Sequence, residues 1–177
     1  NATAIGEKAK ASGTQSTAVG RQSLASMHDA TALGTVSKAT SQRATAIGVL
    51  TQASGKCSTA VGALAVANGF LSQAFGANAT ASGENSSAVG SYATSSNSRS
   101  TAIGTGSATT RDDQLMLGQA ATEVTVANLS GTGTSLIVAN GDGTLSRSTI
   151  SDNGLESLNC EVNGANAVCY GPRANAT

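Results

Sequence analysis

Side chains that could carry out chemistry are few in this sequence and lie far apart. The adjacent carboxylates Asp112 and Asp113 could bind a hard cation, and residues 140–143 (Asn-Gly-Asp-Gly) match part of a calcium loop. That loop lacks the further carboxylates that calcium requires. The only histidine, His28, falls in a turn position that is otherwise polar, so we expect a solvated surface residue. No Cys–His cluster, Ser–His–Asp set or phosphate-binding loop is present, and we predict no enzyme, resident metal or cofactor.

The cysteines are the remaining reactive groups, and they are odd in number. Cys160 and Cys169 are close enough in sequence to close a small disulfide loop in an oxidising compartment. Two free thiols that happen to be near each other are the alternative. Cys57 has no obvious partner within the chain.

Composition excludes several classes of protein. The 177 residues carry ten basic and ten acidic side chains, which gives no global field for nucleic acid or anionic lipid. Aromatic residues make up only 2% of the chain, so a large globular core is not expected. No apolar run is long enough for a transmembrane helix, and the start does not have the pattern of a signal peptide.

A strict repeat explains this composition. Glycine recurs at every fourteenth residue, and the turn glycines of the repeat are Gly6, Gly20, Gly34, Gly48, Gly62, Gly76, Gly90, Gly104 and Gly118. A triplet such as Thr17-Ala18-Val19 precedes each glycine, and a second triplet such as Ser23-Leu24-Ala25 follows it. Both triplets alternate with period two, which indicates very short strands, and glycine and polar residues between them indicate turns. Each repeat is therefore predicted to form one coil of a β-solenoid.

Side-chain size predicts which positions face the interior. A coil this small needs small inward residues, such as the central alanine of the first triplet, so the flanking residues face outward. One flanking position forms an apolar column: Ile5, Val19, Leu33, Ile47, Val61, Phe75, Val89, Ile103 and Leu117. Stacked strands would extend this column over roughly 40 Å. Because a continuous apolar stripe is unfavourable in water, we predict that it is a self-association interface.

The repeat resembles the head domains of trimeric autotransporter adhesins, the YadA-like family. Residues 85–90 (Asn-Ser-Ser-Ala-Val-Gly) are the closest copy of the family repeat, and residues 111–118 (RDDQLMLG) look like the neck motif that closes such a head. The repeat continues into this motif without a break in register, since Leu117 and Gly118 keep their columns. Within the neck, we expect Arg111, Asp112 and Asp113 to form a salt-bridged turn between chains rather than a metal site.

The resemblance implies an all-β fold, a left-handed parallel β-roll in which three chains place the aliphatic column on a common axis. It also implies a bacterial surface protein, an extracellular fibre anchored in the outer membrane by a C-terminal barrel that lies outside this sequence. The implied function is attachment to extracellular matrix proteins, cells or abiotic surfaces, together with a role as a rigid spacer. Nucleic acid is not an implied partner.

The resemblance predicts four regions. The head β-roll covers residues 1–110 and the neck residues 111–131. The family neck usually leads into a heptad stalk, but residues 132–166 instead predict a β-rich connector with a hairpin around residues 140–143. Residues 167–177 are interpreted as the start of a second head, because Cys169, Tyr170 and Gly171 fall in the alanine, aliphatic and glycine columns.

Apolar residues in otherwise polar turns are candidates for surface contacts. Val36, Leu50, Leu64 and Tyr92 each stand two places after a turn glycine, and Phe70 and Leu71 occupy the other turn. They predict either a ligand-binding patch or contact with a neighbouring chain; we favour contact with a chain for Val36, Leu50 and Leu64.

Two other functions remain as alternatives at this point. A phage or virus tail fibre could use the same trimeric roll and would differ at its C-terminal end. An ice- or crystal-binding solenoid would use the threonines that share a face with the aliphatic column, namely Thr3, Thr17, Thr31, Thr45, Thr59 and Thr101.

Overall fold

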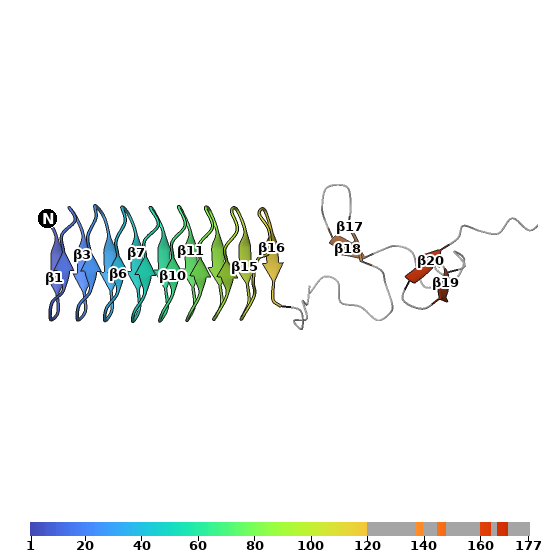
Figure 1. Ribbon diagram of the computed structural model, residues 1–177, viewed down its shortest axis with the longest axis horizontal. Coiled ribbons are helices and arrows are strands. Elements are labelled where there is room, and N and C mark those ends of the chain that lie inside the picture. Colours follow the sequence, from blue (N-terminus) through green and yellow to red (C-terminus); the bar gives the residue numbers. More distant parts are fainter. Residues whose placement is uncertain (120–136, 140–144, 148–159, 164–165, 170–177) are drawn as a thin grey trace, which may run out of the picture. The chain divides into compact units, whose positions relative to one another are not determined.

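The computed structural model describes residues 1–119 and four further strands, at residues 137–139, 145–147, 160–163 and 166–169 (Figure 1). The chain forms two compact units, residues 1–124 and residues 125–177. None of the residues that the structure describes forms a helix that could cross a membrane.

The first unit is a parallel β-solenoid, as the sequence predicts, and its first sheet contains nine strands. Consecutive strands pair in parallel with an offset of one repeat, so that Thr3 lies beside Thr17 and Ile5 beside Val19. The same register continues to the last pair, in which Ile103 lies beside Leu117. These strands are β1 (Thr3–Ile5), β3 (Thr17–Val19), β5 (Thr31–Leu33), β7 (Thr45–Ile47), β9 (Thr59–Val61), β11 (Gln73–Phe75), β13 (Ser87–Val89), β15 (Thr101–Ile103) and β16 (Leu115–Leu117).

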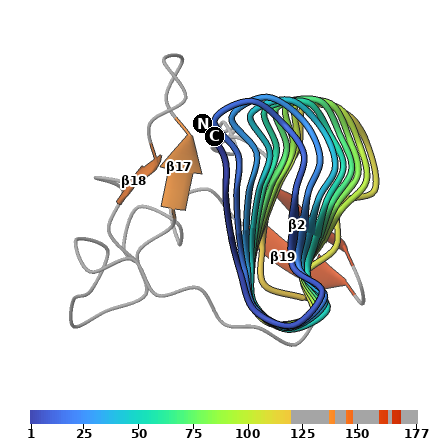
Figure 2. The same ribbon diagram turned by 90° about the vertical axis from the view of Figure 1, so that its left-hand side faces the viewer.

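The second sheet is built from the second triplet of each repeat and contains seven strands. A further parallel bridge between Thr94 and Ala108 continues it by one coil. Seen along the solenoid, successive coils nearly superimpose (Figure 2). The strands are β2 (Lys10–Ala11), β4 (Leu24–Ala25), β6 (Lys38–Ala39), β8 (Gln52–Ala53), β10 (Val66–Ala67), β12 (Thr80–Ala81) and β14 (Thr94–Ser95).

Turns join the two sheets at both ends of each coil, and they share one backbone feature. A residue with positive φ recurs every seven residues, beginning with Lys8, Gln15 and Gln22 at φ values of 55°, 59° and 56°. From Gln15 onward, the N–H of each such residue donates to the preceding coil, as in the 2.8 Å bond from Gln22 to the carbonyl of Glu7. A coil of fourteen residues is therefore two half-coils, each with a left-handed turn residue that stacks on the turn before it.

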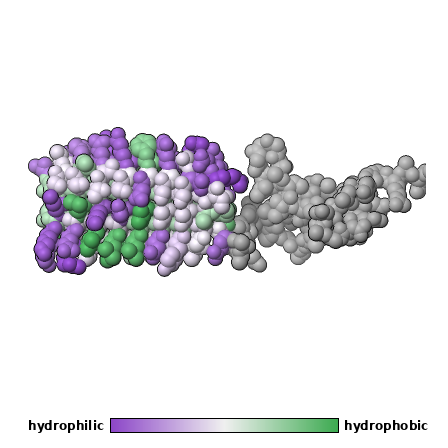
Figure 3. All heavy atoms as spheres, viewed as in Figure 1, coloured by the Kyte–Doolittle hydropathy of each residue, from purple (hydrophilic) through white to green (hydrophobic). Residues whose placement is uncertain are grey.

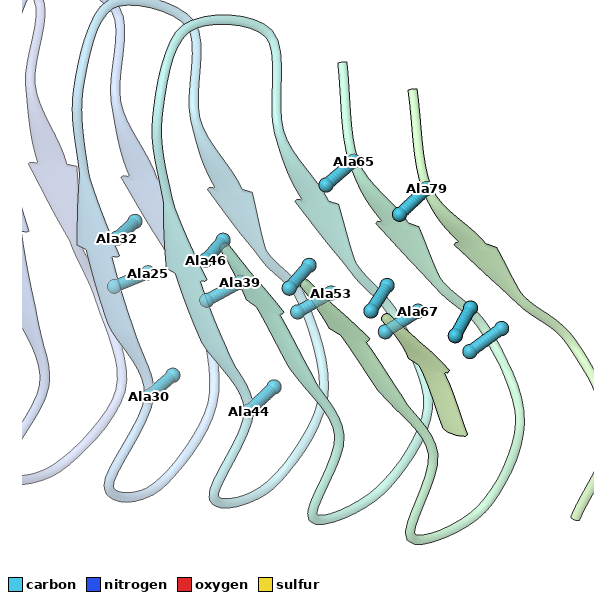
Figure 4. Packing of buried hydrophobic residues seen from close by; sticks show 14 of the residues in the cluster. Ala25, Ala30, Ala32, Ala39, Ala44, Ala46, Ala53, Ala65, Ala67 and Ala79 are labelled. Atoms are coloured by element: carbon cyan, nitrogen blue, oxygen red, sulfur yellow. The ribbon is translucent and has the colours of Figure 1, made fainter. Parts of the chain in front are cut away.

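The interior contains almost nothing but alanine, serine and threonine. The central alanines of the first triplet, from Ala18 to Ala102, are fully buried, as are the flanking alanines of the second triplet such as Ala53 and Ala67 (Figure 4). Ala4 is exposed, because its coil is the first and has no coil on its outer side. Ala9 and Ala11 of the same coil are half-buried, and the alanines predicted to face inward in the later coils are buried.

Buried serines supply the polar part of this interior. The Ser16 hydroxyl donates to the carbonyl of Gly13 at 2.6 Å, and the Ser72 hydroxyl to that of Gly69 at 2.8 Å. Each bond closes a turn of four residues from inside the coil. The buried hydroxyl thus finds its own partner in a carbonyl that also accepts a 3.3 Å hydrogen bond from the N–H of the same serine.

The turn glycines are required for two separate reasons. Gly20 has a φ of +127°, which is accessible to glycine and unfavourable for other residues. In addition, a Cβ at Gly20 would lie 2.5 Å from the carbonyl oxygen of Gly34 in the next coil. The glycine column therefore allows both the turn conformation and the close stacking of coils.

The second unit contains two antiparallel hairpins in its described strands. β17 (Ile137–Ala139) pairs with β18 (Leu145–Arg147), at the place where the sequence predicts a hairpin, while the turn itself, residues 140–143, lies outside the described residues. β19 (Cys160–Asn163) pairs with β20 (Asn166–Cys169). Most of the predicted second head, residues 170–177, lies outside the described residues, as do residues 120–131 of the predicted neck.

Candidate interaction surface

The aliphatic column of the first sheet faces away from its own coil, as predicted. From β3 to β15 the central alanine of each strand in this sheet is buried and both neighbours face outward, as with half-buried Thr17 and Val19 on either side of Ala18. Ile47, Phe75, Val89 and Ile103 remain 37–41% exposed although each has strands on both sides. The residues at the two ends of the column are more exposed, Ile5 at 59% and Leu117 at 45%.

This column is a continuous stripe because the strands pair in exact repeat register. Each aliphatic residue lies beside the next, as Leu33 beside Ile47 and Ile47 beside Val61. Adjacent strands in a sheet are about 4.8 Å apart, so there is no polar gap along the stripe. The outward threonines, such as Thr31 and Thr45, form a second stripe on the same face.

The turn that follows the glycine column adds a second apolar surface at one edge of the solenoid. Val49 and Leu50 are each 50% exposed, and Leu64 in the next coil is 47% exposed. Figure 3 shows this apolar surface along the edge where the turns after β5, β7 and β9 lie. Val36 begins the surface and is half-buried. We name Val36, Val49, Leu50 and Leu64 the apolar turn edge.

Backbone conformation makes these residues unusual. Val36, Leu50 and Leu64 have φ values of 58°, 57° and 61°, in the left-handed region. Asparagine or glycine is favoured there, and a β-branched or bulky apolar residue is unfavourable. Asn78 in the next turn and Gly106 further along have the types that this backbone prefers. The apolar turn edge is therefore not explained by the needs of its own turns.

The opposite turns carry one smaller apolar site. Phe70 and Leu71 are 44% and 42% exposed, and Leu71 is again in the left-handed region. The equivalent pair one coil earlier is Lys56 and Cys57, and Glu84 follows one coil later. Phe70 and Leu71 thus form an isolated apolar pair within a polar column.

Tyr92 is the most exposed large side chain that the sequence singled out, at 65%. It stands in the same turn column as Leu64, but Asn78 lies between them. Tyr92 is consequently separate from the apolar turn edge.

The carboxylates of the neck motif bind within the chain, and the predicted salt bridge between chains stays a prediction. Asp113 forms a two-point ion pair with Arg99, with Nε–Oδ1 and Nη2–Oδ2 distances of 2.6 Å and 2.8 Å. Asp112 accepts a hydrogen bond from the Ser98 N–H at 3.0 Å. The reason is the fourteen-residue spacing, which places both residues directly over the turn of the preceding coil.

This ion pair changes the ionisation of its members. The hydrogen bond from Arg99 and its positive charge hold the pKa of Asp113 below its ordinary value, and Asp113 raises the pKa of Arg99. Both side chains are exposed, at 64% and 59%, so solvent screens the attraction. The pair ties the last coil to the one before it.

No group of three or more metal-ligating side chains occurs among the residues that the structure describes. His28 is exposed, as predicted, and its Nδ1 lies 2.7 Å from Oδ2 of Asp29. Cys57 is a free, half-buried thiol in a turn. The partial calcium loop at residues 140–143 lies outside the described residues.

Three exposed apolar residues escaped the sequence interpretation. Val49 directly follows a turn glycine, Leu115 replaces threonine beside Thr101, and Met27 replaces glycine in the other turn. They are 50%, 62% and 51% exposed. Each of them differs in residue type from the other residues of its column, and this difference could have identified them in the sequence.

The repeats of this chain match a known protein family. The family model described as the YadA head domain repeat matches residues 1–23, 25–50, 39–65, 67–93 and 81–107, which together span more than half of the chain. Among solved structures, the crystal structure of the collagen-binding domain of the Yersinia adhesin YadA is similar, with 18% identity and a TM-score of 0.38. That match covers 80% of this chain and 83% of the other. No curated protein matches the sequence.

Proposed function

Because this chain belongs to the YadA head domain family, we propose that three copies assemble through the aliphatic column and form one segment of an adhesive surface fibre. The single observation that carries this proposal is the unbroken outward stripe from Ile5 to Leu117, which the described residues of the chain leave partly exposed. An adhesin head of this family is a structural module rather than a catalytic one. The number three comes from the family resemblance.

The free energy available from association supports the proposal. Burying one large aliphatic side chain stabilises by roughly 1.5–3 kcal/mol when it is fully removed from water. The residues of the stripe are already partly buried, so association adds only the share of this contribution that their exposed fraction represents, once per coil over nine positions. Alternative cover from within the chain would have to come from residues that lie beyond the solenoid. A symmetric assembly covers every coil with the same contact.

The apolar turn edge fits the same assembly as its border. It lies immediately after the aliphatic column in the chain, since Leu50 is three residues from Ile47 and Leu64 three from Val61. In a trimer the edge of one chain would pack on a neighbouring chain. Contact with a neighbouring chain would explain why bulky residues occupy a backbone conformation that is unfavourable for them.

Adhesion would then depend on the repeated display of the same surfaces along a rigid fibre. Each coil presents an outward second sheet and two turns, and three chains present each surface three times, so that weak contacts can add by multivalency. In this proposal the fibre stands on the bacterial cell surface, held by an outer-membrane anchor, and acts as both spacer and binding surface. Its targets are extracellular matrix proteins, cells or abiotic surfaces.

The native mass of the protein tests the assembly directly. We expect a threefold mass by light scattering after size exclusion. The double variant Ile47→Asp with Val61→Asp should lose it, because two charges would enter one dry interface. Gln52→Asp with Val66→Asp is the matched control, since these residues are also neighbours in adjacent coils but belong to the second sheet. A folded wild-type monomer, or equal loss in both variants, would contradict the proposal.

Adhesion itself is tested with beads that carry the assembled protein. Surfaces coated with collagen or fibronectin, bare polystyrene and a cultured-cell layer are the probes, and an albumin-coated surface is the reference. We expect retention on at least one probe that exceeds the reference and that falls when Phe70→Ser with Leu71→Ser leaves the native mass unchanged. If bead retention on every probe is no higher than on albumin, the adhesive role is contradicted and only the role as a spacer remains.

A further inference from the structure

The second unit places two cysteines directly opposite each other. β19 and β20 run antiparallel, and their register pairs Cys160 with Cys169, Glu161 with Val168, Val162 with Ala167 and Asn163 with Asn166. The cysteines form the outermost pair of the ribbon, which is joined at its other end by two residues. Spacing alone could not have shown this register, because a shift by one residue would place the cysteines on opposite faces.

The position of the pair within the ribbon fits a disulfide. In a hairpin joined by two residues the pair next to the loop is hydrogen-bonded, and the two kinds of pair alternate outward from it. Counting from Asn163 and Asn166, the cysteines are the fourth pair and therefore a pair without hydrogen bonds. The Cα atoms of such pairs are about 4.5 Å apart, within the usual 4.4–6.8 Å of a disulfide.

We propose that Cys160 and Cys169 form a disulfide that closes the β19–β20 ribbon, while Cys57 remains a thiol. The oxidant is a small or protein disulfide of an oxidising compartment. One cysteine thiolate attacks that disulfide and releases one thiol, and the second cysteine then attacks the mixed disulfide and releases another. Two protein thiols thus lose two electrons and two protons, and one oxidant disulfide becomes two thiols.

The disulfide would keep the ribbon from opening when the chain is pulled. Force applied to the chain on both sides of the ribbon would pass through the sulfur–sulfur bond, and residues 161–168 would remain closed. Without the disulfide, only the backbone hydrogen bonds between β19 and β20 would resist this force, and an isolated hairpin is marginally stable. This consequence rests on the proposed role as a fibre segment, whereas the disulfide itself does not depend on self-association.

Peptide mapping of the full chain tests the proposal. The protein is folded with oxidised and reduced glutathione, denatured without reductant and alkylated with iodoacetamide. We expect one adduct, on Cys57, and a tryptic peptide of residues 148–173 that is unmodified and lighter by two hydrogen atoms than its reduced form. Cleavage after Glu161 should leave the two halves joined until a reductant is added.

A swapped variant tests whether register is the cause. Val168→Cys with Cys169→Val keeps the composition but moves the thiol opposite Glu161 and onto the other face. In a glutathione buffer, the equilibrium ratio of closed to open form should fall by at least about tenfold, because cysteines that face apart cannot be bridged without backbone movement. Cys57→Ser is the control and should close as the wild type does.

Three results would overturn the proposal. Adducts on both Cys160 and Cys169 without reduction would show free thiols. A cross-link to Cys57, or a peptide of doubled mass, would show a different pairing. Equal closure of the swapped variant would show that proximity in sequence, not the ribbon, joins the cysteines. Since each readout is covalent, none depends on whether the head assembles as a trimer.

Discussion

At the scale of single residues, the glycine column is constrained both by its backbone conformation and by the close approach of the next coil. Gly20 combines a φ of +127° with a neighbour that leaves no room for a Cβ. Gly106 also has positive φ, at 68°, but it stands in the left-handed column, where other coils carry side chains. The same substitution should therefore have very different effects at the two positions.

We expect Gly20→Asn to lower the free energy of unfolding by about 2 kcal/mol or more, through backbone strain and collision with Gly34. Gly106→Asn should change it by less than about 1 kcal/mol, because asparagine tolerates the left-handed region. Urea unfolding at one fixed protein concentration, followed by circular dichroism, measures both. Equal losses would mean that the close approach between coils does not constrain Gly20.

Asp113 gives a prediction of pH dependence at the same scale. Its pKa is lowered in the folded protein by Arg99, so the ion pair stabilises the last coil above the ordinary pKa of an aspartate. That contribution disappears as the pH falls through the lowered value. In an NMR titration of the Asp113 carboxyl, Arg99→Gln should raise the pKa toward the ordinary value, whereas Arg43→Gln should leave it unchanged. High salt should weaken the difference, and an unchanged pKa in Arg99→Gln would rule out the pair as its cause.

At the scale of elements, the two kinds of turn have the same backbone and different surfaces. Both contain a left-handed residue, but the turn after the glycine column carries Leu50 and Leu64 where the opposite turn carries Arg43 and Cys57. Leucine is not favoured by this backbone conformation, so we expect the two leucines to serve the proposed contact with a neighbouring chain or with a ligand. The native mass after dilution separates a contact between copies from a contact with a ligand.

We expect Leu50→Asn with Leu64→Asn to dissociate at a protein concentration at least about tenfold higher than the wild type, which for a trimer corresponds to about a hundredfold change in the dissociation constant, or about 2.7 kcal/mol per trimer. Arg43→Asn with Cys57→Asn changes the equivalent residues of the opposite turn and should not alter assembly. Light scattering across a dilution series measures both. If the leucine variant assembles normally but its beads lose retention, the apolar turn edge is a ligand surface and not an interface border.

At the scale of the whole molecule, every coil has the same register, so the solenoid should tolerate loss of one complete coil. Deleting residues 49–62 joins Gly48 to Ala63 and restores each column, and we expect a threefold mass and a melting temperature lowered by about 10 °C or less. Deleting residues 49–55 removes half a coil and moves every later aliphatic residue to the second sheet. We expect that variant not to assemble. If it formed a trimer as stable as that of the wild type, the proposed role of the aliphatic column as the interface would be contradicted.

The sequence by itself determined the solenoid, its register and the inward and outward columns of residues 1–118. This was possible because each coil repeats the last, so that residues fourteen apart must be neighbours, as Ile47 and Val61 are. Alternation within a triplet then places alanine inside and the aliphatic residue outside, with no need for long-range information. The hairpin of β17 and β18 was also predictable, from the turn-forming residues between its strands.

Only the tertiary structure decided how neighbouring side chains bind one another across coils and how the turns are shaped. Arg99 pairs with Asp113 inside one chain because stacked turns bring them within 2.6 Å, a distance that no periodicity specifies. The left-handed conformation of Leu50 and Leu64 likewise follows from stacking of each turn on the one before it. The alignment of Cys160 with Cys169 depends on strand register, which a shift of one residue would abolish. These features arise from packing between segments, whereas the repeat records only what each coil has in common with the next.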